Sequence, residues 1–171
     1  EDFLKTGAGE EDAARIFVDG GLRVGRMTSH IQDAGMVMDS MGACVLYPMI
    51  RVPLHVENLA RLYSAATGRQ TSAAELKLCG ERGHNLLKLL NARAGFGRED
   101  DRIPMLWLEP KVTPDGEKVL SDYYHKEEIG EDDLSRELDE YYDERGWDQV
   151  TSHPTAEKLA QLGLDELAKG F

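Results

Sequence analysis

Cysteines and long apolar runs are scarce in this sequence. Its two cysteines, Cys44 and Cys79, cannot form a disulfide framework, and no Asn-x-Ser/Thr glycosylation signal occurs, so the sequence suits a reducing compartment. The longest apolar run, residues 45–50, is interrupted by Pro48 and is much too short to span a bilayer. The first residues also lack the features of a signal peptide. We therefore expect a cytoplasmic protein without a membrane span.

Basic residues are also in short supply. There are 20 Lys and Arg against 32 Asp and Glu, which gives a formal net charge of -12 at pH 7. Because phosphate backbones and anionic lipid surfaces both require a basic face, neither nucleic acid nor a membrane surface is expected as a partner. The deficit lies in the second half, since residues 99–171 hold 8 basic and 21 acidic residues. We expect these acidic side chains to form a solvated outer side of the fold.

The dominant apolar period is helical. Between residues 24 and 41, apolar residues recur at alternating steps of three and four, which places them on one face of a helix. They are Val24, Met27, Ile31, Ala34, Met38 and Met41. A second stretch of this kind begins at Val56 and is followed by a stop signal at Gly68.

A longer helix is expected after Ser72. Ser72-Ala-Ala-Glu75 has the form of a capping box, which marks the first turn of a helix. The apolar residues that follow are Leu76, Cys79, Leu86, Leu87 and Leu90. We expect this face to be packed in the core, Cys79 included, because no second cysteine lies at ligand spacing from it.

Glycine and proline break the pattern over residues 95–118. We expect a loop-rich segment there, with a short strand pair flanking Pro114-Asp115-Gly116. An acidic amphipathic helix follows and ends at Gly146, and a last short helix over residues 155–168 is interrupted by a glycine. No internal repeat is present. The sequence therefore predicts a mainly α, multi-helix fold that forms one domain over residues 1–171.

A family resemblance is carried by several blocks of sequence. Asp39-Ser40-Met41-Gly42-Ala43-Cys44 resembles the Asp-x-x-Gly-Leu-Cys motif of the tungsten-containing aldehyde:ferredoxin oxidoreductases. Further blocks resemble successive segments of that family, in the same order and at similar spacing. These are residues 80–86, 91–96, 98–104, 141–147 and 154–159, followed by Leu162-Gly163-Leu164. The resemblance covers nearly the whole chain.

The resemblance implies that the chain is the C-terminal helical part of a longer enzyme. In that family an N-terminal base holds a tungsten or molybdenum bis-pterin, two helical domains close over it, and a 4Fe-4S cluster lies beside the pterin. Three cluster cysteines come from a Cys-x-x-Cys-x-x-x-Cys run in the middle domain, which this sequence lacks. The fourth comes from the Asp-x-x-Gly-Leu-Cys motif, and the match assigns that role to Cys44.

The residues of this motif suit those roles chemically. A cubane cluster needs thiolate ligands, and Gly42 allows the tight backbone turn that aims a thiolate from the end of a helix. An ionised carboxylate only accepts hydrogen bonds, which suits the N–H donors of a pterin, so Asp39 is expected to contact the pterin. Ala43 stands where the family has leucine, and this difference is expected to alter packing and not ligation.

The implied reaction is oxidation of an aldehyde to a carboxylic acid, with ferredoxin or a similar carrier as electron acceptor. The other partners would be the remaining domains of the enzyme, and a homodimer is one arrangement open to the intact protein. No catalytic acid or base is assigned in this chain, and the isolated fragment is expected to be inactive and without cofactor. The alternative is a helical assembly module with no cofactor of its own. The aldehyde, the metal and the electron carrier stay open.

Overall fold

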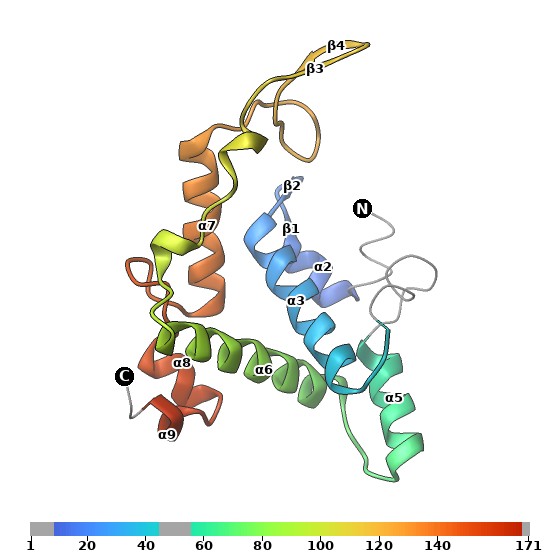
Figure 1. Ribbon diagram of the computed structural model, residues 1–171. Helices are drawn as coiled ribbons and strands as arrows, with labels where there is room; N and C mark the ends of the chain where they lie inside the picture. Colours follow the sequence, from blue (N-terminus) through green and yellow to red (C-terminus); the bar gives the residue numbers. More distant parts are fainter. Residues whose placement is uncertain (1–8, 45–55, 169–171) are drawn as a thin grey trace.

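The computed structural model describes residues 9–44 and 56–168 (Figure 1). In chain order its elements are α2 (Glu10–Ile16), β1 (Phe17–Val18), β2 (Gly21–Leu22), α3 (Val24–Ser40), α5 (Val56–Thr67), α6 (Ala73–Arg93), η1 (Arg98–Asp100), η2 (Met105–Trp107), β3 (Lys111–Thr113), β4 (Gly116–Lys118), α7 (Glu131–Arg145), α8 (Ala156–Gln161) and α9 (Asp165–Ala168). In this part of the chain the strands form only two antiparallel pairs, β1–β2 and β3–β4. None of the described helices is long and apolar enough to cross a membrane. The predicted mainly α fold is confirmed.

Local sequence signals set the helix ends as expected. Ser72 caps α6 by accepting a hydrogen bond from the Glu75 backbone N–H (3.2 Å), while the Ser72 N–H donates to the Glu75 carboxylate (2.8 Å). Gly68 and Gly146, at φ of 74° and 66°, follow the last residues of α5 and α7. These left-handed conformations favour glycine and stop each helix.

Helix α3 is the central element and contacts both α6 and α7 at close range (Figure 1). Glycines make this approach possible. A Cβ atom on Gly80 of α6 would lie 2.3 Å from the Asp33 carbonyl oxygen, and one on Gly25 of α3 would lie 2.8 Å from the Tyr141 nitrogen of α7. The helix backbones are therefore in direct contact at both crossings.

The buried face of α3 differs from the predicted one. Gly25 and Ser29 are buried, whereas Val24 and Ile31 of the predicted apolar face are 37% and 38% exposed. The close crossings explain the difference, because only small side chains fit between α3 and α7. The periodicity correctly predicts a helix but not the face of it that this chain covers.

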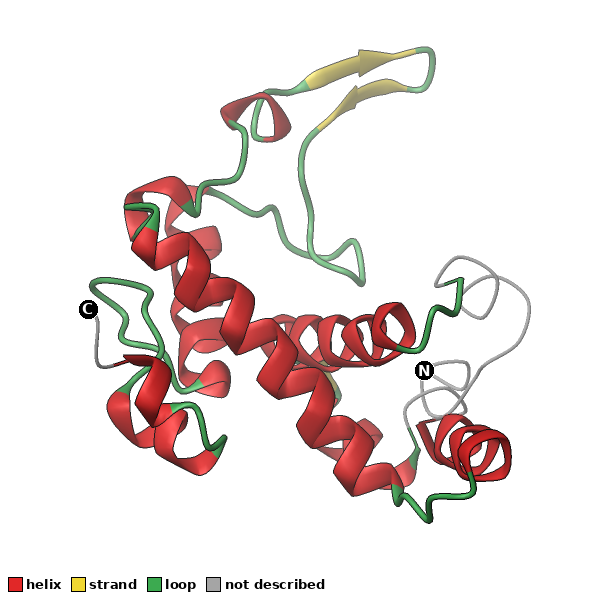
Figure 2. Ribbon diagram, turned by 60° about the horizontal axis from the view of Figure 1, so that its bottom comes forward, coloured by secondary structure: helices red, strands yellow, loops and turns green. Residues whose placement is uncertain are grey.

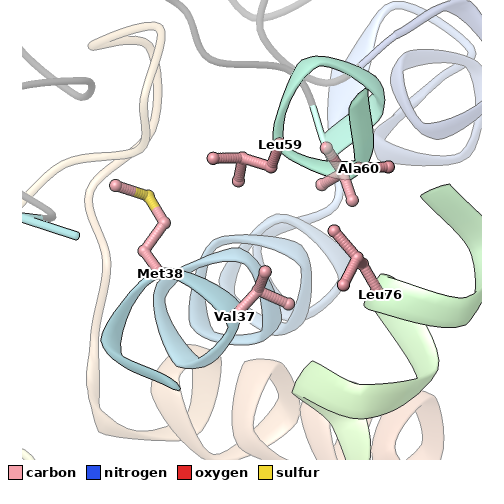
Figure 3. Packing of buried hydrophobic residues seen from close by; sticks show 6 residues of the cluster. Val37, Met38, Leu59, Ala60 and Leu76 are labelled. Carbon is pink, nitrogen blue, oxygen red and sulfur yellow. The ribbon is translucent and has the colours of Figure 1, made fainter. Parts of the chain in front are cut away.

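Apolar side chains gather at the two ends of α6. One cluster joins the end of α3 to α5 and the start of α6 (Figure 3); its members are Val37, Met38, Val56, Leu59, Ala60 and Leu76. The other joins the C-terminal half of α6 to the α8–α9 region and consists of Leu89, Leu159, Leu162 and Leu164. Tyr142 and Trp147 are also buried, and they attach the acidic helix to the core.

The segment between α6 and α7 is loop-rich, as predicted. It contains only the short turns η1 and η2 and the β3–β4 hairpin, whose strands flank residues 114–115. The hairpin projects away from the helices (Figure 2). The residues of η2, which precedes the hairpin, are exposed; they are Met105, Leu106 and Trp107.

The acidic residues after position 98 lie at the surface, and none of those that the structure describes is buried. Some of those on α7 face arginines from the N-terminal part of the chain. Arg15 forms an ion pair with Glu144, and Arg23 lies 3.5 Å from Glu140. The acidic side of α7 is thus solvated along much of its length and neutralised where the N-terminal segment meets it.

The α3–α6 crossing gives a direct test of the fold. We expect Gly80→Ala to lower the free energy of unfolding by about 1–3 kcal/mol, because the added methyl group would overlap the Asp33 carbonyl oxygen. Urea unfolding measures this change. Gly35→Ala on α3 is the matched control, since no other atom lies within 4 Å of the added Cβ. That control should be neutral or stabilising, by up to about 1 kcal/mol. Equal effects of the two substitutions would contradict the close crossing.

Candidate functional site

Helix α3 ends in a glycine turn that leads directly to Cys44. The Gly42 N–H donates to the Asp39 carbonyl oxygen (3.1 Å), and the Ala43 N–H donates to the Met38 carbonyl oxygen (2.9 Å). This pair of bonds forms a Schellman motif, with Gly42 in the left-handed conformation at φ 69°. The motif fixes the direction in which the chain leaves the helix, one residue before Cys44.

Both sequence-predicted site residues lie at this end of α3. Asp39 belongs to the last turn of the helix, and Cys44 is a free cysteine just beyond the Schellman motif. Both side chains are exposed. An exposed thiol is available as a thiolate ligand, and an exposed carboxylate is available as a hydrogen-bond acceptor, so the two groups fit the proposed donor set. Their roles as cluster ligand and pterin contact stay predictions.

Within residues 9–44 and 56–168, no group of three or more His, Cys, Asp or Glu side chains is arranged to hold a metal ion. Cys44 could therefore act only as one ligand of a site shared with other residues. The neighbouring Ala43 packs against the α3–α5–α6 apolar cluster. This position follows the glycine of the Schellman motif and commonly contacts the preceding helix turn. The contact agrees with the expectation that alanine in place of leucine at position 43 alters packing.

Cys79 is exposed, so its predicted place in the core is wrong. It belongs to an exposed row on α6, here called the leucine stripe, that comprises Cys79, Leu86, Leu87 and Leu90. Helix α6 places Gly80 and Gly83 against α3, and Leu87 and Leu90 follow on the same side of the helix at further steps of four and three. Because both leucines are exposed, α3 does not cover this side along the whole length of α6.

A polar cluster holds α3 against α7, and its pairing of Arg145 with Asp33 is not indicated by the sequence. Arg145 is only 1% exposed. Its guanidinium donates hydrogen bonds to the Asp33 carboxylate (2.6 Å), the Gln32 side-chain oxygen (2.6 Å) and the Ser29 carbonyl oxygen (3.1 Å). The Tyr141 hydroxyl also donates to Gln32 (2.7 Å). We call these five residues the polar clamp. Burial raises the pKa of Asp33, and the adjacent guanidinium of Arg145 opposes this rise.

A second set of contacts ties α7 to α6. The Trp147 indole N–H donates to the Asn85 side-chain oxygen (2.8 Å), and the Trp147 ring stacks on His84 at 5.9 Å between centroids. His84 Nε2 lies 3.3 Å from the Tyr141 hydroxyl. Because that hydroxyl already donates to Gln32, we assign the Nε2 proton to His84, which then donates to Tyr141. The block at residues 141–147 thus connects α3, α6 and α7.

An open groove of about 1030 Å³ lies beside the N-terminal half of α3. Its wall includes Lys88 and Asp101, which form an ion pair at 2.7 Å, and Tyr142, whose hydroxyl donates to Asp101 at 2.6 Å. Burial opposes ionisation of Asp101, but the hydrogen bonds from Lys88 and Tyr142 outweigh it and lower the pKa of this carboxyl. Asp39 and Cys44 are not part of the groove wall. The last residue of α3 in the groove wall, Gln32, lies seven residues before Asp39, about 10 Å along the helix axis.

Comparisons with known proteins give one family match and one structure of similar fold. The family model described as "Aldehyde ferredoxin oxidoreductase, domains 2 & 3" matches residues 11–164. One similar solved structure is described as "Active site complex BamBC of Benzoyl Coenzyme A reductase in complex with 1,5 Dienoyl-CoA". The match has a TM-score of 0.64 at 21% sequence identity and covers 90% of this chain. This chain spans 21% of the length of that one.

His84 should make stability depend on pH. Burial, together with the positive charges of Arg145 and Lys88, lowers the pKa of His84 from 6.5 to about 4. The unfolded chain therefore binds a proton near pH 6.5 that the folded chain does not bind until about pH 4. We expect the urea midpoint to fall as the pH drops through this window. In His84→Gln this part of the pH dependence should vanish. An unchanged dependence of the urea midpoint on pH would show that the lowered pKa of His84 is not its cause.

Proposed function

This chain belongs to the aldehyde ferredoxin oxidoreductase family, and we propose that it is the C-terminal helical part of a tungsten or molybdenum bis-pterin, iron–sulfur enzyme. The family match over residues 11–164 supports this assignment, and so does the chain's share of 21% of the length of a structural relative. The proposed reaction oxidises an aldehyde to a carboxylic acid and passes the electrons to a ferredoxin. With two free cysteines, such an enzyme suits the cytoplasm.

The observation that carries the proposal is the glycine turn at the end of α3. It presents one free thiol and one exposed carboxylate at the same end of the central helix. Cys44 would supply one thiolate to a 4Fe-4S cluster whose other ligands come from outside this chain. Asp39 would accept hydrogen bonds from the N–H groups of a pterin. Such a carboxylate is stabilised by each N–H that donates to it.

When bound, the metal–pterin group and the cluster would supply the redox chemistry, as cofactors do in such enzymes. The residues of this chain would hold and orient the groups that bind these cofactors. The Schellman motif fixes the exit direction of the chain before Cys44, and the apolar cluster beneath Ala43 holds that turn in place. We assign no proton-transfer residue to this chain, because the substrate cavity of such an enzyme would be formed mostly by its other domains.

The leucine stripe of α6 supports the idea that further polypeptide covers this chain in the complete enzyme. Leu87 and Leu90 are 49% and 51% exposed, and Leu86 and Cys79 are exposed beside them. A group of exposed apolar side chains on one helix commonly marks a contact surface. This stripe would also suit the second candidate function, a helical assembly module without its own cofactor.

Metal analysis of the complete enzyme distinguishes the two candidates. We expect Cys44→Ala to abolish or reshape the visible absorption of the cluster and to lower the iron content, because a cubane needs its fourth ligand. Cys79→Ala is the matched control, as it removes the chain's other free thiol, and it should leave both readouts unchanged. A complete wild-type protein that lacks iron and tungsten or molybdenum even after reconstitution would favour the assembly module. An unchanged cluster in Cys44→Ala would refute the ligand assignment.

Asp39→Asn tests the pterin contact separately. The amide keeps the shape of the side chain but replaces one acceptor oxygen by a donor, so it should weaken pterin binding. We expect a lower pterin content after gel filtration, measured by fluorescence of the oxidised pterin, with the iron content retained. Asp19→Asn, at an exposed aspartate in the β1–β2 turn, is the control. Equal pterin retention in both variants would contradict the contact.

A further inference from the structure

We propose that Arg145 is a positioning residue for the Asp39–Cys44 turn: by fixing the rotation of α3, the polar clamp aims the thiol and the carboxylate at the end of that helix. This inference rests on the proposed function, because it assumes that the direction of these two groups matters.

Apolar packing leaves the rotation of α3 open over its N-terminal turns. The buried residues of α3 are Gly25, Ser29, Val37 and Met38. The first large apolar side chain buried on the helix is therefore Val37. Apolar contacts are non-directional, and a glycine against a backbone has no side chain that could interlock with a neighbour. A directional interaction on these N-terminal turns would add to the packing of Val37 and Met38 in fixing the angle of the helix about its own axis.

The polar clamp supplies that interaction. The Arg145 side chain is bonded to Asp33, Gln32 and the Ser29 carbonyl, which lie on two successive turns of one helix face. A guanidinium is planar and donates in fixed directions, so these three acceptors can be satisfied together only at one rotation of α3. A buried ion pair adds little net stability, because desolvation offsets the attraction, but it is directional.

Arg145 is itself held rigidly. It is the last residue of α7, directly before the left-handed Gly146 and the buried Trp147. Trp147 is bonded to Asn85 of α6, and the Arg145 guanidinium lies 5.6 Å from the centre of the Tyr141 ring. The clamp therefore fixes the rotation of α3 relative to the α6–α7 pair.

The rotation of α3 also determines the direction of Asp39 and Cys44, the residues of the predicted site. Asp33 lies six residues before Asp39, which is about 9 Å along the helix axis. Since α3 is continuous from Val24 to Ser40 and closes in the Schellman motif, turning it at Asp33 turns the whole Asp39–Cys44 segment. A lysine at position 145 would keep the charge but lose the planar fork, and a methionine would keep only the bulk.

The two native thiols give a readout that does not depend on any cofactor. Spin labels on Cys44 and Cys79, both free and exposed, report the distance between the end of α3 and α6 in this chain. We expect Arg145→Met to shift or broaden this distance by about 1–2 Å, the size of helix shifts at packed interfaces, and Arg145→Lys to do so to a smaller extent. Arg136→Met is the control, because Arg136 is an exposed residue of the same helix whose ion pair is with Asp133 three residues away.

Gln32→Leu removes the acceptor shared by Arg145 and Tyr141 and keeps the test valid if Arg145→Met does not fold. It should shift the distance in the same direction. Unchanged distances in the folded variants of Arg145 and Gln32 would overturn the proposal.

The second readout is the electron paramagnetic resonance spectrum of the reduced cluster in the complete enzyme. Arg145→Lys should change its line shape or midpoint potential, and Arg136→Met should change neither. A shifted distance with an unaltered spectrum would show that the clamp holds α3 without positioning Cys44, and would overturn the proposal. If Cys44→Ala leaves the cluster intact, the ligand assignment fails instead, and the spin-label distances alone decide whether the clamp orients α3.

Discussion

The direct contact of helix backbones at Gly25 and Gly80 is the constraint on which the rest of this structure depends. At these two positions the partner backbone lies so close that not even a Cβ atom fits without a clash. The polar groups of α3 at these crossings must then find partners inside the molecule, because a buried polar group without a hydrogen bond is costly. The polar clamp supplies partners for the Ser29 carbonyl oxygen and for the side chains of Gln32 and Asp33.

The helix ends can be predicted from the sequence because they depend on neighbours within a few residues. The capping box at Ser72 and the glycine stops after α5 and α7 are local signals with a local cause. The hairpin around residues 114–115 is of the same kind. Burial is different, since the period of apolar residues shows which face of a helix is apolar but not which neighbour covers it. For this reason the predicted core position of Cys79 is wrong, and Ile31 is less covered than its place in the pattern predicts.

The candidate site is accessible to sequence reasoning only in part. Asp39 and Cys44 stand out through a motif that resembles a family, and the structure adds the Schellman motif that places them at one helix end. Arg145 lies in a block that resembles the family, but its pairing with Asp33 carries no local signal, because the two residues are 112 positions apart and both are common charged residues. Pairs of this kind become visible only when the fold brings them together. The same holds for the arginines of the N-terminal segment that face the acidic side of α7.

The sequence distance between Arg145 and Asp33 also has a consequence for synthesis. A ribosome releases α3 and Cys44 about a hundred residues before it releases the guanidinium that orients them. Contacts between distant positions form late, because the chain must close a long loop first. The Schellman motif, by contrast, joins residues within one turn and can form as soon as they emerge. The thiol is thus synthesised long before the guanidinium that orients it, so any group that depends on its final direction would be inserted only after Arg145 has emerged from the ribosome.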